Sequence, residues 1–266
     1  MVLKDKLTMI ISSCDKFSDL WDAHVGLLDR NWQDRGIDTY ILTDSKHASN
    51  YDNVKIFSAG DGKEMSERLE TILPLIETEY VFITLDDYFL IKKVDSSRIS
   101  EIISYMDSKY LDYVRLFHLP NSHVKMKGCN GLYNVNLYKS QYAVNFYAGI
   151  WRKSFLTKTI KGSMNAWQYE VSLTQTARRL NAKCAMTKGR EFVILDVVRK
   201  GKILTRANNY FKKNPVYHGS RDIMKKRDEF VLSYRTWAKR ILPKRITQAF
   251  KRRMINNGYK FYSGIE

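Results

Sequence analysis

Two adjacent aspartates, Asp86 and Asp87, directly follow the apolar run YVFITL at residues 80–85. A β-rich apolar run of this length predicts a buried strand, so both carboxylates are expected at its carboxyl end. Charged groups at the edge of a core are costly unless they meet water, a metal ion or a hydrogen-bonding ligand. Carboxylate oxygens are also the ligands with which Mg²⁺ or Mn²⁺ bridges a diphosphate. The alternative is an ordinary turn in which Asp86 caps the next segment, and the pair alone does not decide between them.

Polar residues follow other predicted strands in the same way. They come at or after the ends of three short apolar runs: Ser13 ends residues 7–13 and Asp15 follows them, Asp44 follows 38–43, and Asp61 follows 54–57. In open α/β sheets the ligand crevice lies beyond the carboxyl ends of the strands. We therefore expect these side chains to gather at one edge of a sheet and to line a binding site.

Glu170 is a second candidate for chemistry. It ends the sequence NAWQYE and is one of only six acidic residues in the segment 101–220, which holds 20 Lys and Arg. A carboxylate beside Trp167 and Tyr169 in basic surroundings could act as a general base toward a sugar hydroxyl. The alternative is a helix-surface glutamate, or an acid in a first helical turn that the helix dipole favours.

The elements that must position these residues alternate along the chain. Apolar runs predict strands at 7–13, 38–43, 54–57, 80–85, 111–117 and 192–198. Helical spacing predicts helices over 17–28, 65–76 and 97–107, and the sequence NAWQYE at 165–170 is expected to lead into another. Strands that alternate with helices through short connections predict an α/β fold: a mainly parallel sheet covered by helices on both faces.

Composition limits the class of protein. The chain has 266 residues, of which 44% are apolar and 27% are charged, enough for one large domain or two small ones. We expect no spanning helix and no signal peptide, because no apolar run is long enough. Cys14, Cys129 and Cys184 are odd in number and far apart, so neither a disulfide framework nor a zinc site is expected. These features predict a cytoplasmic protein.

Charge is distributed unevenly. The net charge is −6 over residues 1–100, +14 over 101–220 and +9 over 221–266. An acidic and a basic part of one domain predict a cleft for an anionic ligand. The tail combines basic residues with an apolar stripe that includes Trp237, which favours contact with an anionic membrane surface over simple packing on the domain. We predict a domain at 1–220 and a basic amphipathic helical tail at 221–266.

The order of these motifs resembles that of GT-A-fold glycosyltransferases encoded with bacterial capsule and lipopolysaccharide genes. The resemblance covers roughly residues 7–205 and is carried by SSCDKFSDLW, ILTDS, LDDYFL, AGIWRKSFL, NAWQYE and VVRKGK. It implies a Rossmann-like GT-A sheet and a hexosyltransferase-type enzyme that uses a nucleotide-sugar donor, expected to be UDP-linked. The implied acceptor is a glycan or a lipid-linked sugar, and the implied location is peripheral on the inner face of the cell membrane.

The resemblance also implies roles for single residues. Ser13 and Asp15 would bind the donor, and Asp44 would lie near the base. Asp86 and Asp87 fall where the family's D-x-D motif holds the ribose and the metal-bridged diphosphate. The sequence departs from that motif at its third position, Tyr88, so either Mg²⁺ or Mn²⁺ at Asp87 or the basic segment 101–220 would neutralise the diphosphate. Glu170 falls where inverting members keep the acid that deprotonates the acceptor.

Two other classes stay open. A nucleotidyltransferase-like α/β enzyme would share the strand-end acids, and Glu170 could supply the further carboxylate that it needs. A nucleic-acid-binding protein would also be basic and rich in tyrosine, but the acidic residues of 1–100 would repel phosphates, so no nucleic-acid partner is expected.

Overall fold

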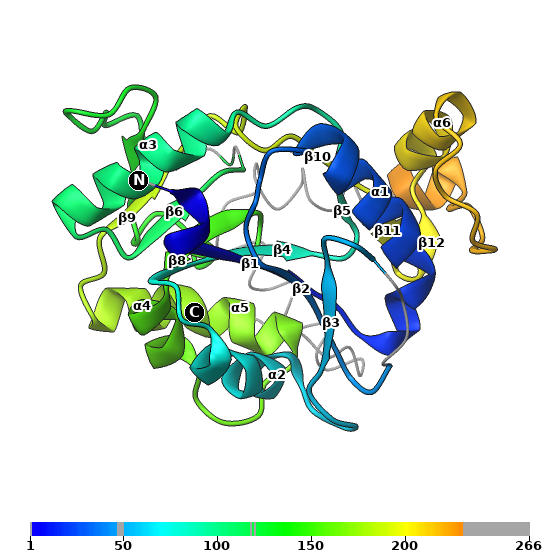
Figure 1. Ribbon diagram of the computed structural model, residues 1–266, viewed down its shortest axis with the longest axis horizontal. Helices are drawn as coiled ribbons and strands as arrows, with labels where there is room; N and C mark the ends of the chain where they lie inside the picture. Colours follow the sequence, from blue (N-terminus) through cyan, green and yellow to red (C-terminus); the bar gives the residue numbers. More distant parts are fainter. Residues whose placement is uncertain (1, 47–50, 118, 120, 231–266) are drawn as a thin grey trace, which may run out of the picture. The chain divides into compact units, whose positions relative to one another are not determined.

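The computed structural model describes residues 2–46, 51–117, 119 and 121–230, and its centre is an eight-stranded sheet (Figure 1). Its strands, in spatial order, are β3 (Lys55–Ser58), β2 (Thr39–Thr43), β1 (Leu7–Ser12), β4 (Tyr80–Leu85), β8 (Gly149–Arg152), β6 (Tyr113–Arg115), β9 (Cys184–Met186) and β7 (Tyr133–Asn134). The first four pair in parallel, and so do β6 and β9. β8 runs antiparallel to both β4 and β6, and β7 runs antiparallel to β9. The prediction of a mainly parallel sheet is confirmed.

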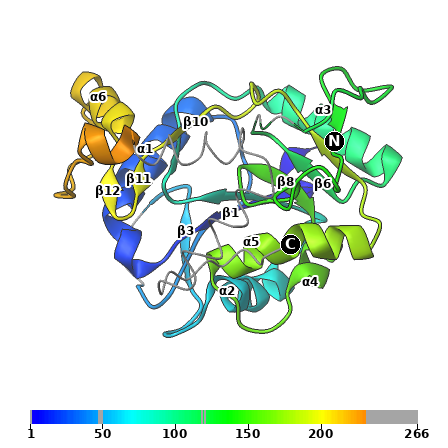
Figure 2. The ribbon, with the colours of Figure 1, turned by 180° about the vertical axis from the view of Figure 1, so that it is seen from behind.

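Helices cover both faces of this sheet (Figures 1 and 2). One face packs against α1 (Trp21–Asn31) and α3 (Ser96–Lys109). The other face packs against α2 (Met65–Ile72), α4 (Lys153–Thr159) and α5 (Ala166–Arg179). The double covering explains why β1 is buried along its whole length and β4 along all but its last residue, since successive side chains point to opposite faces.

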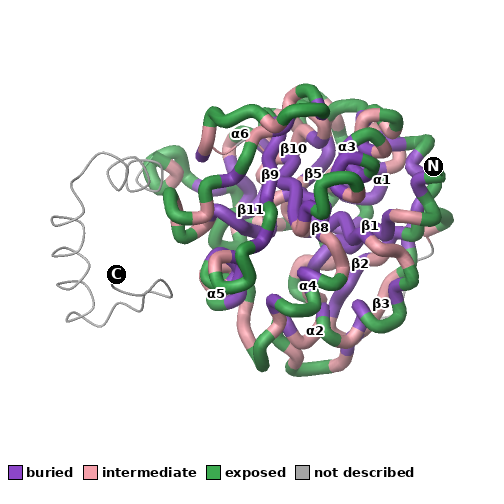
Figure 3. Tube along the Cα trace, turned by 90° about the vertical axis from the view of Figure 1, so that its left-hand side faces the viewer, coloured by how far each residue is buried: buried purple, intermediate pink, exposed green. Residues whose placement is uncertain are grey.

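Strand β4 shows this alternation clearly. Tyr80 and Phe82 belong to the α1/α3 core, whereas Val81 and Ile83 belong to the α2/α5 core. All four are fully buried, and each such burial contributes roughly 1.5–3 kcal/mol. Figure 3 shows the same burial along β1, β8 and β9.

Three predicted elements differ from the structure. The helix expected over 17–28 is a 3₁₀ helix over Asp15–Leu20 that is followed by α1. The helix expected over 65–76 ends at Ile72 and continues as a 3₁₀ turn, Leu73–Leu75, because Pro74 cannot donate the next helical hydrogen bond. The strand expected over 192–198 is interrupted. Its first part, β10 (Ile194–Asp196), pairs antiparallel with β5 (Tyr88–Leu90).

The second part of that predicted strand opens a hairpin, β11 (Val198–Arg199) with β12 (Lys202–Ile203). Lys200 and Gly201 at its tip both have positive φ, which a two-residue hairpin turn of the I′ type requires. The basic residues 199, 200 and 202 therefore lie in this hairpin.

The chain divides into two compact units. The first comprises residues 1–196 and 216–219, and the second comprises 197–215 and 220–266. Within its described residues the second unit holds the hairpin and helix α6 (Thr205–Lys213), and most of the predicted tail, 231–266, lies outside the described residues. The boundary expected at residue 220 stays a prediction. None of the helices that the structure describes is long and apolar enough to cross a bilayer.

Candidate functional site

Three adjacent parallel strands, β2, β1 and β4, end at the same edge of the sheet. Backbone hydrogen bonds continue one residue beyond them, from Ser13 N to the Leu42 carbonyl and from Asp86 N to the Ser12 carbonyl. This continuation holds the residues that follow the strands side by side. Ser13, Asp44 and Asp86, predicted from separate parts of the sequence, thus lie at one edge.

Ser13 and Asp86 form a buried pair. Ser13 Oγ donates to Asp86 Oδ2 at 2.5 Å and accepts from Trp21 Nε1 at 2.8 Å. Asp86 is buried, with only 8% of its surface exposed. The pair fixes the turn between β4 and β5, and Asp86 belongs partly to the core.

His24 also stabilises the turn between β4 and β5, through a hydrogen bond to its backbone. Its Nδ1 donates to the Asp86 carbonyl at 3.1 Å, and its ring packs edge-on against Phe89. Burial lowers the pKa of His24 to about 4, so the imidazole is neutral at pH 7. His24 therefore acts in packing.

Asp15 joins the loop after β1 to the loop after β2. Its backbone N donates to Asp44 Oδ2 at 3.1 Å. Its carboxylate accepts from Thr43 Oγ1 and Ser45 Oγ, each at 2.8 Å, and from the backbone N of Ser45 and Lys46. Burial acts to raise the pKa of Asp15, but these hydrogen bonds outweigh it and lower the pKa to about 2. Asp15 is therefore an anion at pH 7, and its oxygens already accept hydrogen bonds from the protein.

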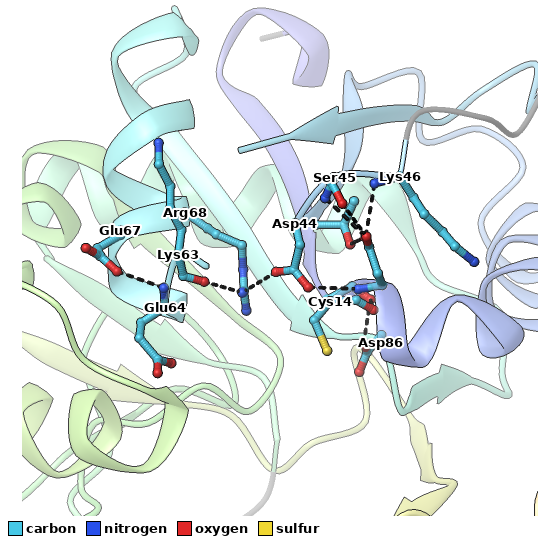
Figure 4. Close-up of polar contacts among 12 residues, drawn as sticks. Cys14, Asp44, Ser45, Lys46, Lys63, Glu64, Glu67, Arg68 and Asp86 are labelled. Carbon is cyan, nitrogen blue, oxygen red and sulfur yellow. Dashed lines mark hydrogen bonds and ion pairs between the residues drawn. The ribbon is translucent and has the colours of Figure 1, made fainter. Parts of the chain in front are cut away.

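Arg68 of α2 completes this side of the edge, and the sequence pattern did not single it out. Its Nη1 lies 2.6 Å from Asp44 Oδ1 and donates to the Lys63 carbonyl at 2.7 Å. A capping box between Glu64 and Glu67 fixes the first turn of α2 and thereby the base of Arg68. Figure 4 shows Asp44 between Arg68 and the Ser45–Lys46 backbone, with Cys14 and Asp86 nearby.

The second group of residues surrounds Tyr88, the first residue of β5. Asp196 is its register partner in β10. Burial raises the pKa of Tyr88 well above its usual value, and Tyr147, Asp87, Asp196 and Glu170 raise it further. The carboxylates of Asp87, Asp196 and Glu170 thus all raise the pKa of the Tyr88 phenol. Glu170 and Asp87, far apart in the sequence, are brought into the same neighbourhood, together with Asp196, which the sequence reading placed inside an apolar strand.

Glu170 is half-buried on α5, which begins with a capping box between Asn165 and Gln168. Burial raises the pKa of Glu170, and a long hydrogen bond of 3.4 Å from Phe146 N opposes this rise.

Aromatic side chains lie near Glu170. Tyr147, the residue after Phe146, stacks between Tyr88 and Phe117, with centroid distances of 5.5 and 4.4 Å. The expected flanking by Tyr169 is wrong, because that side chain points into the core and bonds Thr159. Adjacent residues on a helix face different directions.

Few side chains of the described residues lie together in a way that could bind a divalent cation. The described residues contain no group of three or more His, Cys, Asp or Glu side chains that could hold a metal ion. Mg²⁺, however, is commonly bound through one or two carboxylates together with substrate phosphates and water. Asp87 fits an ion of that kind, which a diphosphate would complete, and does not fit a site made by protein ligands alone.

Comparisons with known proteins give weak similarities. No protein-family model and no curated protein sequence matches the chain. The S. aureus TarS 1–349 structure in complex with UDP-GlcNAc aligns over 74% of this chain and 60% of its own, with 14% identity and a TM-score of 0.47. A UDP-glucose pyrophosphorylase complexed with UDP-glucose aligns over 79% of this chain and 99% of its own, with 11% identity and a TM-score of 0.49.

The bifunctional IspDF from Campylobacter jejuni aligns over 72% of this chain and 52% of its own, at 13% identity and a TM-score of 0.43. The chain thus spans about 60% of the TarS fragment and half of IspDF. Similarities of this strength assign neither a family nor an activity, so the functional conclusion depends on the site itself.

Proposed function

We propose that this protein is a glycosyltransferase that moves a sugar from a nucleotide-sugar donor, UDP-linked in expectation, to a glycan or lipid-linked acceptor. One observation carries the proposal: Glu170, which burial gives a raised pKa, accepts a hydrogen bond from Phe146 N, and the next residue, Tyr147, stacks on Tyr88, which directly follows Asp87. A carboxylate with a raised pKa is a better base than an ordinary one. Beside strand-end acids at the crevice edge of an α/β sheet, it is suited to deprotonating an acceptor hydroxyl.

The donor would lie along the edge formed by β2, β1 and β4. Asp44, oriented by Arg68, would face the base, and Asp86 and Asp87 would face the ribose and the diphosphate. Ser13 already donates a hydrogen bond to Asp86, and Asp15 already accepts hydrogen bonds from Thr43 and Ser45 at the end of β2. We therefore propose that these two residues shape the donor site mainly by holding the other acids in place.

Glu170 would act on the acceptor. It accepts the proton of the acceptor hydroxyl while the oxygen forms a bond to the anomeric carbon from the face opposite the diphosphate. The bond from the anomeric carbon to the diphosphate oxygen breaks, and the nucleoside diphosphate leaves with the electron pair. The product then has the inverted anomeric configuration.

Asp87 would hold Mg²⁺ or Mn²⁺ when the donor is bound, and such an ion would neutralise charge on the leaving diphosphate. The test compares donor affinity by calorimetry with and without Mn²⁺ in wild type and Asp87→Asn. We expect the variant to lose the Mn²⁺-dependent part of the affinity and to transfer no sugar. Equal affinity and turnover in both proteins would remove Asp87 from the site, and full wild-type activity in EDTA would remove only the ion.

A donor screen tests the proposal as a whole. The protein is incubated with UDP-glucose, UDP-galactose, UDP-N-acetylglucosamine, GDP-mannose and a CMP-linked sugar, and hydrolysis is scored by mass spectrometry. Release of the nucleotide from at least one donor is expected. If every donor is inert and none shifts the melting temperature, the proposal fails.

A nucleotidyltransferase is the second candidate, because Asp196 beside Tyr88 offers the additional carboxylate that such an enzyme needs. The same screen therefore includes each nucleoside triphosphate with a sugar 1-phosphate. Pyrophosphate release there, without donor hydrolysis, would favour the second candidate.

The charge of the second unit supports a location for the enzyme. Residues 197–215 and 220–266 hold 19 Lys and Arg against four Asp and Glu, a net charge of +15 out of +17. Ile223 and Phe230 are exposed beside the basic run 225–227, with Phe230 71% exposed. Basic residues next to exposed apolar side chains suit an anionic bilayer surface. We propose peripheral binding to the inner membrane face, in synthesis of a surface polysaccharide such as capsule or lipopolysaccharide.

A further inference from the structure

The segment 143–147, which leads into β8, belongs to no helix or strand, and yet its first four residues are buried. Buried backbone outside regular structure needs other partners for its polar groups. Three consecutive carbonyls of the segment accept hydrogen bonds from fully buried side chains of β6 and α5: Ala143 O from Arg115 Nη1 at 3.1 Å, Val144 O from Thr174 Oγ1 at 3.2 Å, and Asn145 O from Tyr113 OH at 3.0 Å. The position of the segment is therefore fixed by side chains.

Thr174 of α5 binds this segment through both polar backbone groups of one residue. Its Oγ1 accepts from Val144 N at 3.0 Å and donates to the Val144 carbonyl at 3.2 Å. Thr174 and Val144 are both fully buried, so water does not compete for these bonds. A single hydroxyl thus fastens the backbone at Val144 to α5.

Glu170 contacts the same segment one helical turn earlier. Residues at i and i+4 lie on the same face of a helix, so Glu170 and Thr174 both face the segment. Phe146 N donates to Glu170 Oε1 at 3.4 Å, two residues after the Val144 backbone that Thr174 holds. The direction of the Phe146 N–H therefore depends on how the backbone is held at Val144.

We propose that Thr174 is a positioning residue for the general base: by holding Val144, its hydroxyl keeps the Phe146 N–H directed at the Glu170 carboxylate. The role of Glu170 as a base rests on the proposed function, whereas the effect of Thr174 on this carboxylate can be measured without any reaction.

The hydrogen bond from Phe146 stabilises the ionised form of Glu170, against the burial that raises its pKa. Titratable side chains in this neighbourhood include the phenols on which Glu170 acts electrostatically, Tyr88 of β5 and Tyr113 of β6, and the carboxylates that act on Tyr88, Asp87 and Asp196. Burial raises the pKa of both phenols, so both stay neutral while Glu170 titrates. Release of the segment should therefore raise the pKa of Glu170 further.

The first test follows the protonation of Glu170 with neither donor nor acceptor present. Protein labelled with ¹³C at the glutamate carboxyl groups is titrated by NMR, and the Glu170 signal is the one that Glu170→Gln lacks. Thr174→Val keeps the shape of the side chain and removes its hydroxyl, whereas Thr174→Ser keeps the hydroxyl. We expect a higher Glu170 pKa in Thr174→Val than in wild type, and a value close to that of wild type in Thr174→Ser.

The matched control is Thr39→Val. Thr39 is 1% exposed and its Oγ1 donates to the Ile37 carbonyl at 3.2 Å, so the control also loses a buried hydroxyl bond, but at the start of β2. It should leave the Glu170 pKa unchanged. Tyr113→Phe removes the bond from β6 to the Asn145 carbonyl and should raise the Glu170 pKa as Thr174→Val does, which keeps the test available if Thr174→Val does not fold.

The pH–rate profile gives the second readout, measured with the active donor and its acceptor. Thr174→Val should lower turnover about threefold to tenfold on the acidic limb and leave the alkaline plateau and the donor KM nearly unchanged. A purely structural loss would lower turnover equally at every pH. If wild type turns over no donor, the proposed function fails while the NMR titration still decides the role of Thr174. An unchanged Glu170 pKa in Thr174→Val, or an equal rise in Thr174→Ser or Thr39→Val, overturns the proposal.

Discussion

Asp15, at the sheet edge, and Glu170, on α5, have opposite chemistry because their surroundings differ. The pKa of Asp15 falls to about 2, since burial is outweighed by hydrogen bonds from Thr43, Ser45 and Lys46. The pKa of Glu170 rises, since burial is opposed only by the long bond from Phe146. Asp15 is thus suited to hold structure, and Glu170 to exchange a proton.

Replacing Glu170 by glutamine keeps its shape and removes its basicity. Transfer should fall about 10²–10⁴-fold while donor affinity stays the same, because general base catalysis contributes that much. The wild-type pH–rate profile should have an acidic limb above the usual glutamate pKa of 4.5, since burial raises the pKa, and the variant should lack it.

The matched control is Glu77→Gln, an exposed glutamate outside the site, which should behave as wild type. Product configuration read by NMR gives an independent check. Retention of configuration, or near-normal turnover in Glu170→Gln, would remove this residue from the mechanism.

Asp15→Asn should lower the free energy of unfolding at pH 7 by about 1 kcal/mol, a value already reduced for screening by solvent. Because the folded pKa lies below the ordinary value of 3.8, the stabilisation is present above that pH and is lost as the pH falls toward 2. Urea unfolding of wild type and variant at several pH values should therefore converge in acid. Asp61→Asn, an exposed turn residue, serves as the control, and a difference that persists at pH 2 would contradict this account.

At the scale of elements, α2 links the two groups of site residues. Ser66 holds the loop at 162–164, Glu67 Oε2 accepts from Ser163 Oγ at 2.8 Å, and Arg68 pairs with Asp44. Three consecutive residues thus fasten the start of α5 to the strand-end edge. Helix α2 carries no proposed catalytic group, but it sets the distance between the donor side and the acceptor side of the site.

Arg68→Ala should weaken nucleotide binding about tenfold, because Asp44 loses the cation that orients it. Calorimetry with the nucleoside diphosphate of the active donor measures the change, and far-ultraviolet circular dichroism checks the fold. Arg30→Ala, an exposed arginine near the end of α1, is the control. Unchanged affinity in Arg68→Ala would show that the Asp44 pair does not shape the donor site.

At the scale of the whole molecule, the charge follows the compact units. The second unit carries +15 and the first only +2, so +6 of the +14 expected for 101–220 belongs to residues 197–215. The first unit therefore carries less of the positive charge that the sequence segments predicted for a basic cleft. The +8 of residues 101–196 is what the first unit can offer to a diphosphate.

Reversing Lys225, Lys226 and Arg227 to glutamate should weaken binding to phosphatidylglycerol vesicles by at least about a hundredfold, since each basic residue near an anionic surface contributes about 1 kcal/mol. Co-sedimentation over a salt series measures this. The control reverses Lys139, Lys158 and Lys161, which are also exposed and belong to the first unit. Equal loss in both triple variants would mean that only net charge matters. Binding to single-stranded RNA but not to vesicles would contradict the membrane proposal.

The sequence alone determined the features that arise from local patterns. The run at 80–85 is strand β4 with the boundaries expected, because an apolar run of that length between polar residues has few other structures. The sequence at 165–170 predicted a helix in this region, and α5 begins at Ala166 because the Asn165 side chain caps its first turn. The strand-end acids follow from these boundaries, because residues after parallel strands meet at one edge.

Only the tertiary structure decided which of these residues meet. The Arg68–Asp44 pair, the position of Asp196 opposite Tyr88, and the antiparallel insertion of β8 between β4 and β6 join segments that lie far apart in the chain. The break after β10 has the same origin, since Asp196 pairs with β5 while Val198 pairs with β12. Side-chain periodicity reports which face of an element is buried, and it contains no information on the partner that buries it.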